Sequence, residues 1–274
     1  MSKFFPYLGG KRLLARTIIP LLPEHRLHCE PFSGSATILL EKPPSVAEIL
    51  NDINGEIITL FRAVQSHPEE FLRQVRWNLR SREEFQRFRD TPPESLTDIQ
   101  RAARIYFLMR AGYSGKLPDA GCHFAGKMAG SQRPFSIYRI EETVYEIHRR
   151  LENVTIERLP YDECLQRYDG QDTLFYCDPP YYGHEKDYGP GIFGREDFTR
   201  LAGLLREISG RFLLGINDLP EVREIFVAFT LREVATTYNA GTRHGHGKQA
   251  QELLVANFDL PEAIIQPFKR LEKG

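Results

Sequence analysis

The sequence predicts an α/β protein with a mostly parallel sheet and a helical insertion. Short apolar runs of strand length alternate with segments of helical periodicity through most of the 274 residues. This alternation is typical of a parallel sheet that is covered by helices on both faces. The last two strand-like runs are joined without a helix, which predicts an antiparallel hairpin at one edge of the sheet.

Seven strands and four helices can be placed in order along the chain. Each expected strand is a short apolar run followed by turn-forming residues. The strands cover residues 26–32, 46–52, 154–159, 173–178, 211–218, 231–239 and 252–258. The helices between them cover residues 13–22, 36–42, 55–65 and 198–209. We therefore expect a mixed seven-stranded sheet in which the last two strands form the hairpin.

Residues 66–153 interrupt this alternation between the second and third strands. Helical periodicity recurs in this segment, for example in residues 98–110, but no convincing strand is present. We therefore expect two regions. Residues 1–65 and 154–274 would form the sheet domain, and residues 66–153 would form a helical insertion.

Composition and charge limit the class of protein. With 41% apolar and 27% charged residues, the chain has the composition of a soluble globular protein. No apolar run approaches the ~18 residues of a membrane span, and the N-terminus lacks the apolar core of a signal peptide, so we expect no membrane contact and a cytoplasmic location. Residues 62–150 hold 16 Lys and Arg against 11 Asp and Glu, and the remainder holds 20 against 26. A basic middle segment permits contact with nucleic acid, although a solvated helical surface is an equally good explanation.

Neither the cysteines nor the histidines predict a metal site. The four cysteines form no CxxC pair, which argues against zinc ribbons and redox motifs. His244 and His246 have HxH spacing in the loop between the last two strands. Two histidines without a third ligand favour a loop that contacts phosphates over a metal site.

Residues with potential chemistry follow the first two expected strands. Ligands of open α/β sheets bind beyond the carboxyl ends of the strands. Small residues around Gly34 would let a ligand approach free N–H groups at a helix start, although a plain turn capped by Ser35 is the alternative. Asp52 ends the second strand 18 residues after Gly34, where an acid can accept hydrogen bonds from ribose hydroxyls. The GxGxxG fingerprint is absent, which disfavours NAD.

The fourth strand ends in the rigid sequence Asp178-Pro179-Pro180-Tyr181. Two successive prolines fix φ and remove two N–H donors, so the turn can hold acceptors at set positions. The Asp178 carboxylate and a proline carbonyl are such acceptors, and Tyr181 adds a flat stacking face. Two acceptors and a ring suit the planar amino group of an aromatic base, whereas a rigid turn with solvated aromatic side chains is the alternative.

Six segments in order resemble the Dam-like D12 class of adenine-N6 DNA methyltransferases. They are PYLGGK (6–11), EPFSGSA (30–36), ILNDIN (49–54), TLFYCDPPYY (173–182), FLLGIND (212–218) and ELLVANF (252–258). The resemblance covers nearly the whole chain outside the insertion. It implies a Rossmann-like methyltransferase fold, S-adenosylmethionine as cofactor and double-stranded DNA as substrate. It further implies flipping of the target adenine and direct methyl transfer to its N6 amine. Cytosine-N4 enzymes usually have Ser in place of Asp178, so this residue favours adenine.

The resemblance also implies roles for individual residues. Asp178, Pro179, Pro180 and Tyr181 would form the catalytic turn, and Asp52 would bind the ribose hydroxyls. The remaining cofactor contacts would come from Tyr7, Gly9, Gly10, Lys11, Glu30, Phe32, Gly34 and Asp178. In the loop after the third strand, either Tyr161 or Asp162 would contact the cofactor adenine.

The helical insertion would recognise the DNA target. The run from Arg110 to Lys116 resembles the RxGYNG loop of the family, with Ser114 at the usual Asn, which disfavours GATC as the recognition sequence. Arg110, Tyr113 and Lys116 are candidate DNA contacts, and a structural Gly-rich turn is the alternative. Phe193 and its aromatic neighbours Tyr182 and Tyr188 would either form a lid or pack on the surface.

Three other functions are compatible with parts of this pattern. A related enzyme could methylate cytosine N4 or RNA, and analysis of the methylated nucleoside would separate these products. A catalytically inactive methyltransferase fold could act as a DNA-binding module, but Lys11, Asp52 and Asp178 are all present. A nicotinamide dehydrogenase would leave the Asp-Pro-Pro-Tyr turn unexplained. The pattern does not indicate a protein partner. It also leaves open whether the protein accompanies a restriction enzyme, comes from a prophage or acts alone.

Overall fold

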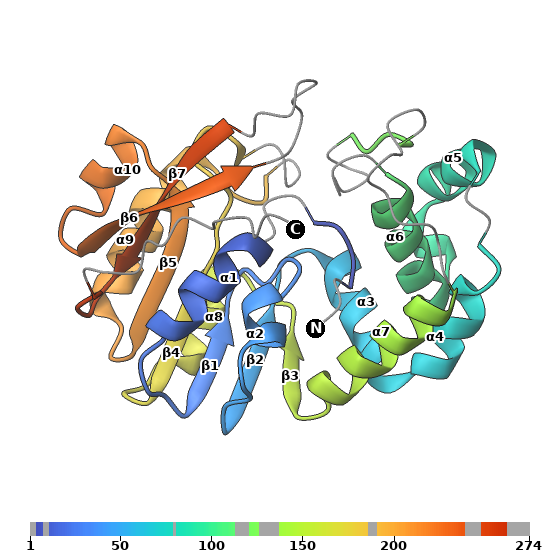
Figure 1. Cartoon of the computed structure of the whole chain (residues 1–274), viewed down its shortest axis with the longest axis horizontal. Coiled ribbons are helices and arrows are strands. Elements are labelled where there is room, and N and C mark those ends of the chain that lie inside the picture. The colour runs from blue at the N-terminus through green and yellow to red at the C-terminus, as the bar shows by residue number, and fades with distance from the viewer. Residues whose placement is uncertain are drawn as a thin grey trace, which may run out of the picture.

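The computed structural model describes residues 4–7, 11–78, 81–112, 121–125, 137–185, 191–238 and 248–261. Its centre is a seven-stranded sheet with the order β3-β2-β1-β4-β5-β7-β6 (Figure 1). The strands are β1 (Leu27–Glu30), β2 (Ala47–Asn51), β3 (Val154–Glu157), β4 (Thr173–Cys177), β5 (Arg211–Asn217), β6 (Thr230–Tyr238) and β7 (Lys248–Ala256). All seven expected strands form, so the predicted fold class is confirmed.

The direction of the strands places a ligand site near the middle of the sheet. Strands β1 to β5 pair in parallel, whereas β7 pairs antiparallel with both β5 and β6. The expected C-terminal hairpin is therefore confirmed. From β1 the chain proceeds to β2 and β3 on one side, and β4 then pairs with β1 on the other side. The carboxyl ends of β1 and β4 thus form the topological switch point, where open α/β sheets bind ligands.

Helices cover both faces of the sheet (Figure 1). They are α1 (Arg12–Ile18) with the 3-10 turn η1 (Ile19–Leu21), α2 (Thr37–Glu41), α3 (Gly55–Ser66), α8 (Tyr161–Tyr168), α9 (Arg195–Glu207) and α10 (Pro220–Ile225). Side chains alternate along a strand. In β4, Tyr176 accordingly joins the apolar cluster under α1, and Phe175 joins the cluster under α8 and α9.

The sequence did not predict α8 and α10. Both are short, and few of their side chains are buried. The buried residues are Tyr161, Cys164 and Leu165 in α8 and Val222 in α10. Such short segments do not contain enough apolar residues to produce a clear helical period.

Among the described residues of the segment expected to be a helical insertion, four α-helices lie beside the sheet (Figure 1). They are α4 (Pro68–Val75), α5 (Arg82–Asp90), α6 (Asp98–Ala111) and α7 (Ile137–Leu151), with the 3-10 turn η2 (Pro93–Ser95) between α5 and α6. The apolar core of α4, α6 and α7 continues into α3 and the N-terminal Phe4 and Phe5. Because the core is continuous, the exact division at residues 65–66 and 153–154 stays a prediction. Within the described part of the chain, no helix is long and apolar enough to cross a membrane.

Candidate active site

A pocket of about 720 Å³ lies at the switch point, beyond the carboxyl ends of β1 to β4. Residues 30–35, 52–54 and 159–163 line it from the loops after β1, β2 and β3. Asp178 and Pro180 contribute the part that follows β4, and residues 191–193 complete the wall. A volume of this size falls within the range of about 300–1,000 Å³ that is typical of small-molecule sites.

Most of the residues that the sequence singled out for a cofactor surround this pocket. They are Tyr7, Lys11, Glu30, Phe32, Gly34, Asp52, Tyr161, Asp162 and Asp178, together with Pro180 of the expected catalytic turn. Pro179 and Tyr181 are adjacent in sequence to this lining and are not part of it. Gly9, Gly10, Tyr113, Tyr188, Lys116, His244 and His246 lie outside the described residues.

Asp52 joins the loops after β1 and β2. Its Oδ2 accepts a hydrogen bond from the Gly34 N–H at 2.8 Å, and its Oδ1 accepts one from the Asn54 N–H at 2.9 Å. Burial raises the pKa of Asp52, and the two N–H donors oppose this effect. Gly34 has φ +46°, and a Cβ at this position would lie 2.7 Å from Cε1 of Tyr7. The sequence therefore needs glycine here so that Tyr7 can approach the loop.

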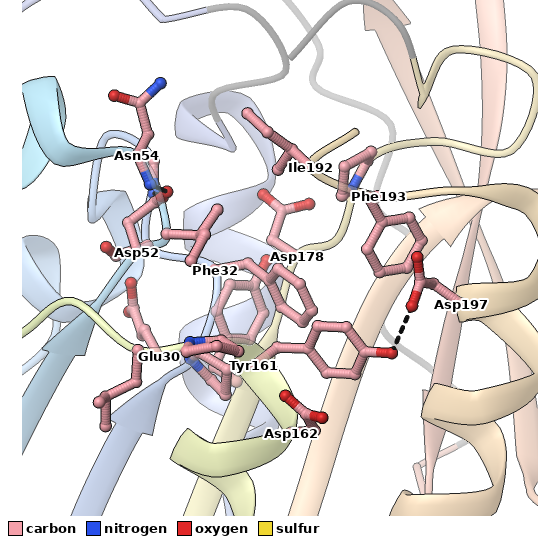
Figure 2. A pocket seen from close by; sticks show the side chains of 18 of the residues that line it. Glu30, Phe32, Asp52, Asn54, Tyr161, Asp162, Asp178, Ile192, Phe193 and Asp197 are labelled. Atoms are coloured by element: carbon pink, nitrogen blue, oxygen red, sulfur yellow. Dashed lines mark hydrogen bonds between the residues drawn. The ribbon is translucent and has the colours of Figure 1, made fainter. Parts of the chain in front are cut away.

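Glu30 forms the buried floor beside Asp52 (Figure 2). Its Oε1 accepts a hydrogen bond from the Leu39 N–H at 2.6 Å and lies 3.1 Å from Nε2 of His28. Burial raises the pKa of Glu30 to about 8, although the Leu39 N–H and Lys42 lower it. The carboxyl group therefore holds a proton at neutral pH until a positive charge is placed near it.

Asn51 fixes the loops on both sides of β2, a role that the sequence did not reveal. Its Nδ2 donates to the carbonyl oxygens of Pro31 at 2.9 Å and Leu159 at 3.0 Å. Its Oδ1 accepts a hydrogen bond from the Leu159 N–H at 2.8 Å. One buried amide side chain thus holds the lining after β1 against the lining after β3.

Three aromatic rings line the end of the pocket away from Asp52 (Figure 2). The rings of Phe32 and Tyr161 are stacked with centroids 5.3 Å apart, and Phe193 packs at 5.9 Å from Phe32. The Tyr161 hydroxyl donates to Asp197 at 2.8 Å, and burial together with this carboxylate raises the pKa of Tyr161. Phe193 is buried in this cluster, so it is part of the pocket wall and not a surface residue.

Asp162 lies beside the aromatic cluster but has a different partner. Its Oδ2 accepts a hydrogen bond from Arg200 of α9, whose side chain is 61% exposed. Both Tyr161 and Asp162 line the pocket, so both stay candidates for the expected contact with the adenine of a cofactor.

Four polar side chains meet at the turn after β4. Nζ of Lys11 lies 2.9 Å from Oδ1 of Asp178 and 3.3 Å from Oε2 of Glu252 in β7. Lys11 also donates to the Tyr181 hydroxyl, and that hydroxyl donates to Glu252. Burial raises the pKa of Asp178 to about 6, while Lys11 lowers it and Glu252 raises it further. Within the described residues, no cluster of His, Cys, Asp and Glu could hold a metal ion.

Arg110, the described member of the expected DNA contacts, lies in α6 away from this pocket lining. Its Nη1 donates to the Phe4 carbonyl oxygen at 3.4 Å, and its guanidinium lies 5.4 Å from the Tyr106 ring centroid. The hydrogen bond to Phe4 connects α6 to the N-terminal segment that leads to Tyr7. A role of Arg110 in DNA binding stays a prediction.

Comparison with known proteins identifies a matching family and several relatives. Residues 7–240 match the family model of the D12 class N6 adenine-specific DNA methyltransferases. The chain is 25% identical to the Type II methyltransferase M1.LlaDCHI of Lactococcus lactis subsp. cremoris, covering 94% of this chain and 96% of that protein. It is 25% identical to the Retron Ec67 DNA adenine methylase of Escherichia coli, covering 94% and 92%. It is 26% identical to the DNA adenine methylase of Escherichia coli (strain K12), covering 97% and 98%.

Proposed function

The chain belongs to the D12 class of N6 adenine-specific DNA methyltransferases, and from this premise we propose how its residues methylate adenine in DNA. The proposed cofactor is S-adenosylmethionine, and the proposed target is the N6 amine of an adenine flipped out of double-stranded DNA. The observation that carries the proposal is the position of Asp178, which lies on a double-proline turn and is held by Lys11 at the edge of a cofactor-sized pocket. A cytoplasmic location is proposed with it.

The pocket has the groups that such a cofactor needs. Each Asp52 oxygen already accepts one backbone N–H, and a carboxylate oxygen can accept a second hydrogen bond, here from a ribose hydroxyl. The rings of Phe32, Tyr161 and Phe193 offer a stacking site for adenine. Glu30 can pair with the amino group of the methionine part. When bound, the cofactor supplies an electrophilic methyl carbon on a sulfonium.

The residues of the turn would make the target amine a better nucleophile. The lone pair of an exocyclic amine is delocalised into the adenine ring. Asp178 and the Pro179 carbonyl would each accept one N–H of this amine, which moves the nitrogen toward a tetrahedral geometry and directs its lone pair. By analogy with oxyanion-hole deletions, losing one such preorganised partner raises the barrier by about 3–4 kcal/mol. No side-chain nucleophile is required, so Cys177 stays a core residue.

Tyr181 would hold the flipped base beside this turn. Extruding a base from a duplex requires a few kcal/mol, and stacking on an aromatic ring returns about 1–3 kcal/mol per base. The Tyr181 hydroxyl is fixed by Lys11 and Glu252, so the ring is ordered before DNA binds. Phosphate contacts would supply the remaining binding energy. Arg110, Tyr113 and Lys116 of the helical insertion are the candidate DNA contacts.

A product analysis tests this proposal. The protein is incubated with methyl-labelled S-adenosylmethionine and a mixed-sequence duplex, and the labelled nucleosides are separated. We expect N6-methyladenine, and Asp178→Ala should lower its formation by at least about a hundredfold. Label only in N4-methylcytosine, or only in RNA offered in parallel, would contradict the adenine assignment. Full activity of Asp178→Ala would contradict the role of the turn.

A further inference from the structure

Glu252 is a buried acid at the catalytic turn that contacts neither the cofactor nor the target base in the proposed reaction. It lies in β7 and is 0% exposed. Its carboxylate accepts a hydrogen bond from the Tyr181 hydroxyl and pairs with the ammonium group of Lys11. A charged side chain is unfavourable in a protein interior unless its partners are well placed. The buried charge of Glu252 so close to Asp178 therefore indicates a functional role.

Lys11 is shared between the two carboxylates. Its Nζ lies 2.9 Å from Asp178, 3.3 Å from Glu252, and donates to the Tyr181 hydroxyl. An ammonium group can donate three hydrogen bonds, and the oxygens of three side chains surround this one. The same Nζ lies 4.3 Å from the centroid of the Tyr181 ring. Glu252 therefore influences where Lys11 lies and how strongly its positive charge interacts with Asp178.

We infer that Glu252 is a positioning residue for methyl transfer, acting on Asp178 through Lys11 and on the stacking ring through the Tyr181 hydroxyl. If Lys11 paired with Asp178 alone, it would neutralise that carboxylate and weaken it as an acceptor for the target amine. With Glu252 as second partner, Lys11 offsets the charge of Asp178 less, so the ionised carboxylate is more basic and a stronger acceptor. The inference rests on the proposed function, because it assigns Asp178 the role of acceptor.

The charges around Asp178 predict the direction in which its pKa changes when the charge of Glu252 is removed. The groups that face Asp178 are Lys11 before α1, Glu30 at the end of β1, Tyr176 and Cys177 in β4, and Glu252 in β7. Burial raises the pKa of Asp178 to about 6, and the negative charge of Glu252 contributes to the increase. Turnover needs ionised Asp178, so kcat should fall as the pH falls through this pKa. The part of the pH–rate profile in which kcat falls in acid is its acid limb. Removing the charge of Glu252 lowers the pKa of Asp178 and moves this acid limb to lower pH.

The test compares Glu252→Gln with a matched loss of buried charge elsewhere. Glu48 in β2 is also buried and pairs with a lysine, Lys42, but is not part of the site. We expect Glu252→Gln to lower kcat at least about tenfold, by analogy with outer-shell partners of metal ligands, and to move its acid limb to lower pH. Glu252→Asp, which keeps the charge, should retain the wild-type limb. Glu48→Gln should lower the melting temperature without moving the limb.

A second readout does not depend on activity. In the cofactor-free protein, the carboxyl carbon of Asp178 is titrated by NMR and assigned with Asp178→Asn. Its pKa should be lower in Glu252→Gln than in the wild type. If kcat, the acid limb and this pKa all stay at wild-type values while Glu252→Gln only melts earlier, Glu252 is purely structural and the inference is wrong.

Tyr181→Phe tests the inference if Glu252→Gln does not fold. This substitution removes only the hydroxyl that joins Tyr181 to Lys11 and Glu252. We expect kcat to fall and the acid limb to stay in place, because the charges remain, whereas wild-type kcat would overturn the inference. A wild-type protein that forms no N6-methyladenine would instead refute the proposed function, and the NMR titration would still measure the coupling.

Discussion

The side chain of Asn217 forms two hydrogen bonds with the backbone of Tyr182. Its Oδ1 accepts from the Tyr182 N–H at 2.9 Å, and its Nδ2 donates to the Tyr182 carbonyl oxygen at 3.0 Å. Asn217 ends β5, the strand next to β4. The neighbouring strand therefore fixes the chain where it leaves the Asp-Pro-Pro-Tyr turn, in addition to the stiffness that the prolines provide.

Replacing Asn217 with Ala should impair turnover more than cofactor binding. The substitution leaves the Tyr182 N–H and carbonyl without this partner, so the acceptors of the turn are less well oriented. We expect kcat to fall by about tenfold or more, because small misplacements of catalytic groups have effects of this size. Steady-state kinetics together with calorimetry of cofactor binding measure both effects. Unchanged kcat would show that the prolines alone orient the turn.

The sequence predicted those residues of the pocket lining that lie in local patterns. Asp52 and Asp178 each follow an apolar strand at the edge where a parallel sheet binds ligands, so the strand pattern identified them. Asn51, Asn217 and Glu252 lie in segments that were also recognised, but their roles were not found. Each acts on a residue distant in the chain, such as Leu159 or Tyr181, and strand periodicity contains no information about such pairs. The pairings depend on the strand order, which is known only from the folded structure.

Cofactor binding should release a proton from Glu30. Because burial raises its pKa to about 8, the carboxyl is protonated at pH 7 in the free protein. A cationic amino group beside Glu30 would favour the carboxylate and lower this pKa. The enthalpy of S-adenosylmethionine binding at pH 7 should therefore depend on the ionisation enthalpy of the buffer, with a slope approaching one proton.

Two controls identify the group that loses this proton. Glu30→Gln should abolish the buffer dependence. 5′-Methylthioadenosine, which lacks the cationic amino group of the methionine part, should show no buffer dependence with the wild type. The release should also disappear when the pH is well above the pKa of about 8, where Glu30 is already ionised. Equal binding enthalpies in Tris and phosphate at pH 7 would contradict this reading.

Gly34→Ala should weaken cofactor binding beyond its effect on folding. The left-handed backbone at φ +46° destabilises a non-glycine residue by about 1–2 kcal/mol. The new Cβ would also lie 2.7 Å from the Tyr7 ring, which must shift in the pocket. Gly121→Ala is a matched control, because Gly121 has φ +75° and its Cβ would have no neighbour within 4 Å. Equal cofactor affinity in the two variants would show that the approach of Tyr7 is not needed for binding.

Tyr161 should contribute more to cofactor binding than Asp162. The Tyr161 ring stacks on Phe32 inside the pocket, and stacking of a base on an aromatic ring is worth about 1–3 kcal/mol. Asp162 pairs with Arg200, whose side chain is 61% exposed, and exposed pairs contribute little. Calorimetry should show a larger loss of affinity for Tyr161→Ala than for Asp162→Ala, and a small loss for Tyr161→Phe. The reverse order would assign the adenine contact to Asp162.

Arg150→Met should destabilise the protein strongly, because Arg150 connects the helical insertion to the sheet. From the end of α7 its Nη2 donates to Oε1 of Glu48 in β2 at 2.8 Å and to the Leu39 carbonyl oxygen at 2.5 Å. The Arg150 side chain is 8% exposed and that of Glu48 is 4% exposed. Removing one partner of a buried ion pair typically destabilises a protein by about 3–5 kcal/mol. Urea unfolding of the two proteins measures this difference.

The pH dependence of this loss distinguishes the ion pair from simple packing. Burial raises the pKa of Glu48, but the hydrogen bonds from Arg150 and Lys42 outweigh it, and the net pKa is lowered. The stabilisation is therefore complete above the usual pKa of a glutamate and is lost as the pH falls through the lower pKa of the folded state. The difference between wild type and Arg150→Met should accordingly shrink in acid. Arg87→Met removes an exposed pair with Glu84 and should change the free energy of unfolding by less than about 1 kcal/mol. A similar, pH-independent loss in both variants would mean that Arg150 acts through the apolar part of its side chain.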